Sequence, residues 1–303
     1  MKKVLVVGGT GFIGYNLIKK IKKSFQIFSI SKNKPYPEFK VKGIKYIICD
    51  ITKKNQIKKR LNKNFNFIIN LGGYINHADL KKTYLSHFEG CKNLVDFFKN
   101  KKVEKFIQIG SSMEYGKAKV PHKETYKCNP IGNYGKSKYL ASEYIKKNLN
   151  NFNIKYFILR LYQIYGPYQN QERLLPIIIN KCLKNEKFAC TSGFQKRDFL
   201  YVGDLVELLE ILIKEKNKSN LILNVGSGKK MKVKYLINSV KKLTKKGLPD
   251  FGKIKMRKDE SINNYPDISK VQKLFKWKPK TSLKKGINKT ILFYKKKLNH
   301  LNK

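Results

Sequence analysis

The chain of 303 residues carries 67 lysine and arginine residues against 20 acidic ones, which gives a formal net charge of +47, and 41% of its residues are hydrophobic. This length and apolar content can bury the core of one large domain or of two smaller ones. No apolar run approaches the roughly 20 residues that a membrane-spanning helix needs. The opening Met1-Lys2-Lys3 and the apolar residues 4–7 run into a glycine-rich turn, which favours a buried first strand over a signal peptide.

The large positive charge raises the question of nucleic-acid binding, because a basic surface attracts phosphate. Only five of the 67 basic residues are arginines, and the lysines are spread along the whole chain instead of forming a tail or one basic helix. Arginine is the side chain that binds phosphates and bases through two hydrogen bonds at once. We therefore interpret the charge as solvated lysine-rich faces with no specific nucleic-acid partner, and a non-enzymatic nucleotide- or RNA-binding protein stays open as an alternative.

The cysteines and histidines do not have the spacing of a metal site or of a disulfide framework. No Cys-x-x-Cys pair occurs, and the histidines lie far apart in the sequence. This pattern predicts no metal site and fits a reducing, cytoplasmic compartment. The residues concerned are Cys49, Cys91, Cys128, Cys182, Cys190, His77, His87, His122 and His300.

Short apolar runs alternate with amphipathic helical stretches, a pattern that is typical of a parallel sheet covered by helices on both faces. The predicted strands are residues 4–7, 26–30, 44–48, 67–71, 105–109, 153–161, 199–202 and 222–225. The predicted helices are residues 12–23, 53–61, 80–100, 133–149, 174–183, 204–214, 233–243 and 283–298. We predict an α/β fold with a doubly wound Rossmann sheet in residues 1–165, to which 198–245 partly returns, and a smaller C-terminal lobe in 166–303.

A glycine-rich turn lies between the first predicted strand and the first predicted helix, which is the context that a dinucleotide-binding turn requires. Gly8 permits the tight turn, Gly11 lets the backbone approach a pyrophosphate, and Gly14 permits close packing of the helix on the sheet. The first helical turn would then offer its N–H groups to the phosphates. The predicted dinucleotide contacts of this segment are Gly8, Thr10, Gly11, Phe12, Ile13 and Gly14.

The end of the second predicted strand bears on the form of the dinucleotide. An acidic residue there normally binds the ribose 2′-hydroxyl of NAD. This strand instead ends in Ser31 and Lys32, and the first acidic residue of the chain is Glu38. Hydroxyl and ammonium groups suit a 2′-phosphate, so we predict an NAD(P) site that favours NADP.

Further motifs follow in a fixed order. The sequence Tyr134-Gly135-Lys136-Ser137-Lys138 stands at the start of a predicted helix, and Gly110-Ser111-Ser112-Met113-Glu114-Tyr115-Gly116 follows a predicted strand. With the glycine-rich turn, these motifs resemble an extended short-chain dehydrogenase/reductase of the nucleotide-sugar epimerase/dehydratase family. The resemblance covers nearly the whole chain and includes the segments 49–51, 70–73, 159–167, 197–204, 224–228, 267–270 and 277–279.

The resemblance implies specific roles for three residues. Tyr134 would be the acid/base; a free phenol titrates near roughly 10, and the ammonium of Lys138 would lower that pKa by favouring the phenolate. Lys138 would also hold the nicotinamide ribose hydroxyls. Ser111 would hydrogen-bond the sugar oxygen as it changes between hydroxyl and ketone.

The resemblance also implies the remaining contacts of the cofactor and the substrate. Asp50 and Ile51 would touch the adenine, and the strand end 71–73 would form a wall of the cofactor site. The C-terminal lobe would bind the substrate, a nucleoside-diphosphate sugar. The implied wall residues are Leu71, Gly72 and Gly73, and the implied substrate contacts are Ser112, Gln163 and Arg197, where Gln163 replaces the family's usual asparagine.

The resemblance bears on the type of reaction as well. Dehydratases of the family carry an acidic residue two positions after the catalytic Ser or Thr, and Met113 stands there, with Glu114 one position later. We therefore predict an NAD(P)-dependent 4-epimerase or 4-keto-6-deoxy-sugar reductase acting at C4 of a nucleoside-diphosphate hexose. A 4,6-dehydratase stays an alternative, because a shift of the loop by one residue could turn Glu114 inward. The family also implies a homodimer formed through the helices 80–100 and 133–149.

Overall fold

The computed structural model describes residues 1–256 and 260–301 and divides the chain into two compact units. Each unit is described by itself. Unit 1 comprises Met1–Ala118, Glu124–Leu161 and Val206–Val225, and unit 2 comprises Lys119–Lys123, Tyr162–Leu205 and Gly226–Lys303.

Unit 1 contains a seven-stranded sheet in the order β10-β6-β5-β4-β1-β2-β3, and all its neighbouring strands run parallel. The predicted α/β class is confirmed. The order reverses between β1 and β4, which is the point where doubly wound sheets bind ligands at the carboxyl ends of their strands. The strands are β1 (Lys3–Val7), β2 (Gln26–Ser31), β3 (Lys45–Ile48), β4 (Phe67–Asn70), β5 (Lys105–Ser111), β6 (Lys155–Leu161) and β10 (Leu221–Val225).

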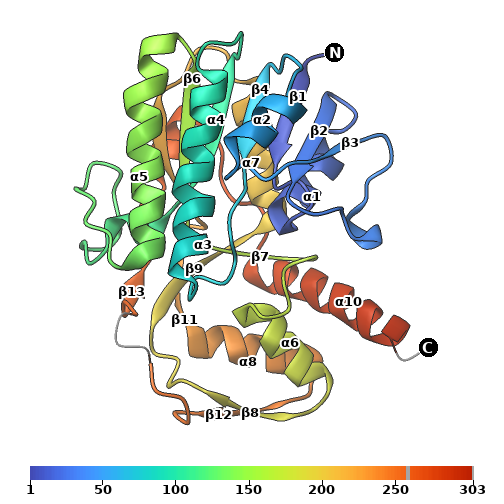
Figure 1. Ribbon diagram of the computed structural model, residues 1–303. Helices are drawn as coiled ribbons and strands as arrows, with labels where there is room; N and C mark the ends of the chain where they lie inside the picture. Colours follow the sequence, from blue (N-terminus) through green and yellow to red (C-terminus); the bar gives the residue numbers. More distant parts are fainter. Residues whose placement is uncertain (257–259, 302–303) are drawn as a thin grey trace. The chain divides into compact units, whose positions relative to one another are not determined.

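The strands of this sheet are apolar on both sides because helices cover both faces. Val4, Leu5 and Val6 follow one another in β1, and all three are fully buried. Figure 1 shows α4 and α5 side by side on one face of the sheet. Lys20 of α1 forms an ion pair with Glu210 of α7 at 3.5 Å. The helices are α1 (Phe12–Ile21), α2 (Lys54–Arg60), α3 (Leu80–Tyr84), α4 (Gly90–Phe98), α5 (Gly132–Leu149) and α7 (Val202–Lys214), whose first residues belong to unit 2.

The helical stretch predicted over residues 80–100 is present with one interruption. A π-helical turn, η2 (Leu85–Glu89), separates α3 from α4. The burial of apolar residues also differs on the two sides of this turn, since Leu94 and Val95 of α4 lie in the core, whereas Leu80 of α3 is 63% exposed. Helix α4 therefore contributes to the core of unit 1, while Leu80 lies at its surface.

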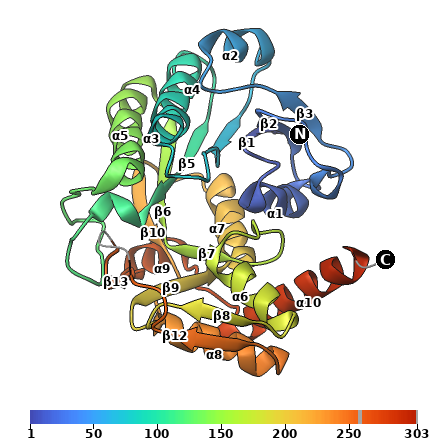
Figure 2. The same cartoon turned by 60° about the horizontal axis from the view of Figure 1, so that its bottom comes forward.

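Unit 2 has its own apolar core, in which α6 packs against α8. Figure 2 shows its paired strands β8 and β12 side by side. Its small sheet is centred on β9, which pairs in parallel with β7 and β13 and antiparallel with β11. Residues 199–201 of the predicted strand 199–202 belong to β9 and therefore to this sheet, whereas Val202 is the first residue of α7. The elements are β7 (Gln163–Tyr165), α6 (Leu174–Leu183), β8 (Lys187–Cys190), β9 (Lys196–Tyr201), β11 (Lys230–Lys232), α8 (Val233–Thr244), β12 (Leu248–Phe251), β13 (Asn263–Asn264), α9 (Ser269–Phe275) and α10 (Leu283–Leu301).

The segment after α9 is fastened to the start of α7. Nε1 of Trp277 donates a hydrogen bond to the backbone oxygen of Asp204 at 3.2 Å, and the Asp204 carboxylate accepts from the N–H and the hydroxyl of Thr281 at 3.1 and 3.0 Å. Both Trp277 and Asp204 are buried. The segment that contains the Trp-Lys-Pro motif is therefore joined by hydrogen bonds to the start of α7 within unit 2.

Membrane segments, disulfides and metal clusters can be assessed for the described part of the chain. Within residues 1–256 and 260–301, no helix is long and apolar enough to cross a membrane. The five cysteines carry free thiols, and four of them are buried. Over the same described residues, no group of three or more His, Cys, Asp or Glu side chains is placed to hold a metal ion.

The glycine-rich turn yields a test of the fold. A Cβ added at Gly14 would lie 2.3 Å from the Gly8 oxygen and 2.6 Å from Cα of Gly9, both rigid backbone atoms, whereas a Cβ at Gly11 would meet only the Gly8 oxygen at 3.3 Å. We expect Gly14→Ala to lower the free energy of unfolding by about 1–3 kcal/mol and Gly11→Ala to lower it by less than about 1 kcal/mol. Urea unfolding measures both, and equal losses would contradict the described turn.

Candidate functional site

The glycine-rich turn forms a cradle at the carboxyl end of β1. Gly8 has φ +74°, its N–H donates to the oxygen of Ile30 at 2.8 Å, and the N–H of Gly11 donates to the Gly8 oxygen at 3.0 Å. A Cβ at Gly8 would lie 3.2 Å from Gly72, so the turn and the end of β4 approach closely. Helix α1 begins after Gly11 without a capping side chain. Its first N–H groups therefore face no side-chain acceptor of their own helix, an arrangement that suits phosphate.

The end of β2 meets the loop after β3. The side chain of Lys32 is 75% exposed, and its Nζ lies 3.5 Å from Oδ2 of Asp50. Burial alone would raise the pKa of the Asp50 carboxyl, but hydrogen bonds from Thr52 and the charge of Lys32 outweigh it and hold that pKa below its usual value. The hydroxyl of Ser31 donates to the oxygen of Asn33 at 2.8 Å. The predicted cofactor residues Lys32 and Asp50 thus come together from two different strands.

Helix α5 carries a buried lysine to the end of β5. The side chain of Lys138 is 3% exposed, and its Nζ donates to the backbone oxygen of Ile109 at 2.8 Å. Burial lowers the pKa of this ammonium to about 8. The same Nζ lies 6.0 Å from the ring centroid of Tyr134, one helical turn earlier. Tyr134 and Lys138 therefore share one face of the helix, and that face is turned toward the sheet.

A glycine brings this helix against the serine loop. A Cβ at Gly135 would lie 2.7 Å from the backbone oxygen of Met113, which belongs to the short helix η3 (Ser112–Tyr115). Ser111 precedes this helix, and its Oγ accepts a hydrogen bond from the N–H of Met113 at 3.2 Å. Ser111 and Ser112 are both buried. The start of α5 and the loop with Ser111 thus lie in contact at the same end of the sheet.

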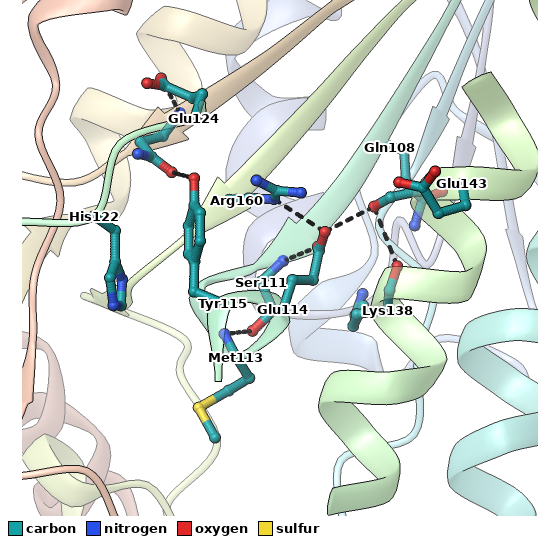
Figure 3. Close-up of polar contacts among 12 residues, drawn as sticks. Gln108, Ser111, Met113, Glu114, Tyr115, His122, Glu124, Lys138, Glu143 and Arg160 are labelled. Atoms are coloured by element: carbon teal, nitrogen blue, oxygen red, sulfur yellow. Dashed lines mark hydrogen bonds and ion pairs between the residues drawn. The ribbon is translucent and has the colours of Figure 1, made fainter. Parts of the chain in front are cut away.

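Glu114 faces the interior of unit 1, where both oxygens of its carboxylate accept hydrogen bonds. Oε2 lies 3.0 Å from Nε of Arg160 on β6 and accepts from the hydroxyl of Ser142 on α5 at 3.0 Å, and Oε1 accepts from the N–H of Ser111 at 2.8 Å. The side chains of Glu114 and Arg160 are 0% and 3% exposed. Figure 3 shows the carboxylate between Arg160 and Ser111. The side chain of Glu114 therefore points into the interior, where it forms a buried ion pair with Arg160.

Met113 occupies the position at which the resemblance expects the acid of a dehydratase. Its side chain is 37% exposed, and a thioether cannot transfer a proton. The neighbouring carboxylate belongs to the buried pair with Arg160. The described loop therefore holds a serine and a methionine where elimination of water would need a carboxylic acid.

Two histidines that the sequence motifs did not connect with Tyr134 lie against its ring. The ring of His77 stacks on that of Tyr134 with centroids 3.9 Å apart and planes at 15°, and His87 meets the same ring at 5.0 Å and 80°. His77 comes from the loop after β4 and His87 from the π-helical turn η2. No periodic pattern links a loop residue to a helix residue ten positions later, so only the tertiary structure reveals this group.

The predicted substrate residues lie on both units. Ser112 belongs to unit 1, whereas Gln163 and Arg197 lie in unit 2 on β7 and β9. Gln163 is exposed. Arg197 is 7% exposed, and its Nη2 lies 2.6 Å from Oε1 of Glu260. Its Nη1 donates to the backbone oxygens of Lys196 and Ile262 at 2.9 and 3.2 Å.

The described geometry defines an α/β protein with a phosphate-suited glycine turn and a Ser, Tyr and Lys set at one end of a parallel sheet. Residues 4–226 match the family model described as the NAD dependent epimerase/dehydratase family. This match covers well over half of the chain. The chain belongs to this family, as the sequence motifs predicted.

Individual relatives agree over nearly the full length. A putative UDP-glucose 4-epimerase of Methanocaldococcus jannaschii is 29% identical, with 96% of this chain and 98% of that protein covered. The dTDP-D-glucose 4,6-dehydratase of Mus musculus is 26% identical over 99% of this chain and 90% of its own. The crystal structure of the Thermus thermophilus UDP-glucose 4-epimerase complex with NAD has a TM-score of 0.87 at 20% identity, covering 97% of this chain and 99% of that one. The last comparison confirms the fold.

The buried ion pair yields a prediction on stability. Glu114→Gln keeps the shape of the side chain but leaves the guanidinium of Arg160 buried without its counter-charge, so we expect a loss of about 3–5 kcal/mol in the free energy of unfolding. The control is Glu143→Gln, which breaks the partly exposed pair between Glu143 and Lys146 and should cost no more than about 1 kcal/mol. Chemical denaturation compares the two, and similar losses would show that the Glu114 pair is not structural.

The buried ammonium yields a prediction on pH. Lys138 has a folded-state pKa of about 8, whereas a lysine of the unfolded chain titrates near roughly 10.4. The unfolded chain therefore binds this proton more readily between those values, so the charge of Lys138 weakens the fold below about pH 8, and the penalty fades as the pH rises. Relative to Lys138→Met, the wild-type free energy of unfolding should rise by on the order of 2 kcal/mol from about pH 7 to about pH 10.

The matched control for this pH series is Lys136→Met, because Lys136 lies on the same helix with an exposed side chain. Its difference from wild type should stay flat over the series. A flat difference for Lys138→Met as well would contradict the burial of the Lys138 ammonium.

Proposed function

We propose that this protein is a nucleoside-diphosphate-hexose 4-epimerase, which inverts the configuration at C4 through oxidation and reduction. The observation that carries the proposal is the serine loop: Met113 stands where a dehydratase needs an acid, and Glu114 is bound by Arg160. The loop and helix α5 still supply a serine, a tyrosine and a lysine, which are the groups that transfer at C4 requires. The name of the 29% identical relative from Methanocaldococcus jannaschii supports the same reaction.

The cofactor proposed for this reaction is a nicotinamide dinucleotide, whose ring supplies the hydride acceptor and donor when it is bound. The residues that would hold it are the cradle at Gly8 and Gly11, the start of α1, and the ammonium of Lys138. The cradle leaves room for a phosphate, since even a Cβ added at Gly11 would meet only the Gly8 oxygen, at 3.3 Å. Ser31 and the exposed Lys32 favour NADP, while the Thermus thermophilus relative was solved with NAD.

Tyr134, Lys138 and Ser111 would each have a separate role in the reaction at C4. Tyr134 would remove the proton of the C4 hydroxyl as the carbon is oxidised and return it when the carbon is reduced. The buried Lys138 ammonium lies 6.0 Å from the Tyr134 ring centroid and would favour the phenolate by its charge. Ser111 would hold the C4 oxygen in both its hydroxyl and ketone forms.

Arg197 is proposed as the diphosphate ligand of the substrate. Its guanidinium suits a bidentate contact with phosphate oxygens. In unit 2 it is already paired with the carboxylate of Glu260. The carboxylate of Glu260 is an anionic acceptor bound at Nη2 of Arg197. This pair supports the proposal that the guanidinium binds a phosphate oxygen through the same nitrogen.

Two further expectations belong to this proposal. The resemblance implies a homodimer through α3, α4 and α5, and exposed apolar side chains on α3 and α5 support it. These are Leu80, Tyr84 and Leu140.

A second candidate reaction is reduction of a 4-keto-6-deoxy sugar, which Ser111, Tyr134 and Lys138 could also serve. The end of β2, with Ser31 and Lys32, favours this reaction, because NADPH would then be the consumed reductant.

The test is a panel of UDP-, GDP-, dTDP- and CDP-hexoses and their 4-keto-6-deoxy derivatives, incubated with the purified protein with no added dinucleotide, with NAD and with NADPH. We expect interconversion of C4 epimers without net loss of NADPH absorbance, and we expect Tyr134→Phe to lower kcat by at least about a hundredfold. Stoichiometric oxidation of NADPH on 4-keto substrates would identify the reductase instead. Unchanged turnover by Tyr134→Phe would contradict both reactions.

A further inference from the structure

The π-helical turn between α3 and α4 carries one histidine into the interior. Single π-turns within helices are frequent at functional sites. His87 lies on η2 (Leu85–Glu89) and is 5% exposed. An aliphatic side chain is the usual occupant of a buried helical position, whereas position 87 holds a polar imidazole.

The hydrogen bonding of His87 defines its tautomer. Its Nε2 lies 3.1 Å from the backbone oxygen of Tyr74. A carbonyl oxygen only accepts, so Nε2 carries the proton, and Nδ1 is an unprotonated acceptor. Burial, followed by the charge of Lys138, lowers the pKa of His87 to about 2. Within residues 1–256 and 260–301, no hydrogen-bond partner reaches Nδ1. His87 is therefore a neutral ring held by one hydrogen bond.

The position of this ring depends on a glycine. A Cβ at Gly73 would lie 2.2 Å from Cε1 and 2.7 Å from Nδ1 of His87. Real Cβ atoms essentially never approach other atoms so closely. Gly73 and His87 therefore form a matched pair, because the imidazole fills the space that any other residue at position 73 would occupy.

Two imidazoles enclose the ring of Tyr134. His77 covers its face at 3.9 Å, and His87 meets it nearly perpendicularly at 5.0 Å. The two imidazoles also meet each other, with centroids 5.7 Å apart at 70°. Stacked and edge-to-face arrangements are the favoured geometries of neighbouring aromatic rings, so the two contacts together favour one orientation of the phenol.

We propose that His77 and His87, the histidine clamp, are positioning residues for Tyr134. The clamp holds the phenol where its hydroxyl meets the C4 oxygen of the substrate, and Gly73 keeps the space that the clamp needs. This inference rests on the proposed role of Tyr134 in transfer at C4. The clamp itself touches neither the transferred hydride nor the transferred proton, and misplacement of a reacting group by about 1 Å can cost about a hundredfold in rate.

The first test separates positioning from other roles by kinetics. His77→Ala removes the stacked ring, whereas His77→Phe retains it; His87→Gln retains a donor for the Tyr74 oxygen but removes the ring. We expect His77→Ala and His87→Gln to lower kcat about tenfold or more with KM and dinucleotide affinity within about twofold, and His77→Phe to stay near wild type. A loss of dinucleotide affinity in place of kcat, or an unchanged kcat in His77→Ala, would overturn the proposal.

The second test needs no turnover. Nitration of the whole protein by tetranitromethane, followed by peptide mapping, measures how accessible the phenol ring of Tyr134 is. We expect His77→Ala to increase nitration of Tyr134 several-fold and His77→Phe to leave it unchanged, and equal nitration in all three proteins would overturn the clamp. If the wild-type protein turned over no nucleotide sugar while this contrast persisted, the proposed function would fail and the clamp would stand.

The glycine completes the test. Gly73→Ala should lower the midpoint of thermal unfolding because its Cβ strikes the His87 ring, and the double variant Gly73→Ala/His87→Ala should recover it without recovering kcat. A stable single variant, or a double variant with wild-type kcat, would contradict the proposed matched pair.

Discussion

The buried carboxylate of Glu114 holds together the segments that carry the candidate catalytic residues. It accepts from the N–H of Ser111, pairs with Arg160 on β6 and accepts from Ser142 on α5. Arg160 in turn lies over the ring of Tyr115, 4.6 Å from its centroid. A charge this deeply buried must keep its partner, because removing either one leaves the other unpaired in the interior. One side chain therefore joins the serine loop, strand β6 and helix α5.

This structural role limits the chemistry of the site. A carboxylate engaged by a guanidinium, a hydroxyl and an N–H is not available to give a proton to a sugar, and the adjacent Met113 has no proton to give. The groups proposed for the chemistry are Ser111, Tyr134 and the buried Lys138, which suit exchange of a hydride and a proton at one carbon. The network that holds the serine loop thus engages the Glu114 carboxylate, which supports the proposed reaction without loss of water.

Much of this arrangement can be predicted from the sequence, and the rest depends on contacts that no spacing records. The glycine turn and the strand-helix alternation predicted the parallel sheet, because they rest on local geometry and periodicity. The short strands of unit 2 escaped prediction because three or four residues carry no measurable alternation. The sheet to which residues 199–201 belong could not be predicted, since an apolar run does not reveal its partner strands, which are β7, β11 and β13. Glu114 could be placed only once Arg160, 46 residues later, was found beside it.

The histidines illustrate the same limit at the level of the site. His77 and His87 lack any metal-ligand spacing, and each alone would pass for a loop residue or a core residue. Their shared contact with Tyr134 follows from the π-helical turn and from the bare Cα of Gly73, and both of these features belong to the folded chain. The proposed catalytic residues stand in recognisable sequence motifs, whereas the proposed positioning residues can be found only from the packing of the folded chain.

The proposed site oxidises and reduces C4 without removing water, and this distinction can be measured directly. The measurement combines mass spectrometry and NMR spectroscopy of the product formed from a nucleoside-diphosphate hexose deuterated at C4. We expect a product of unchanged mass, inverted at C4 and still carrying the deuterium there. A product lighter by one water would contradict the proposed chemistry.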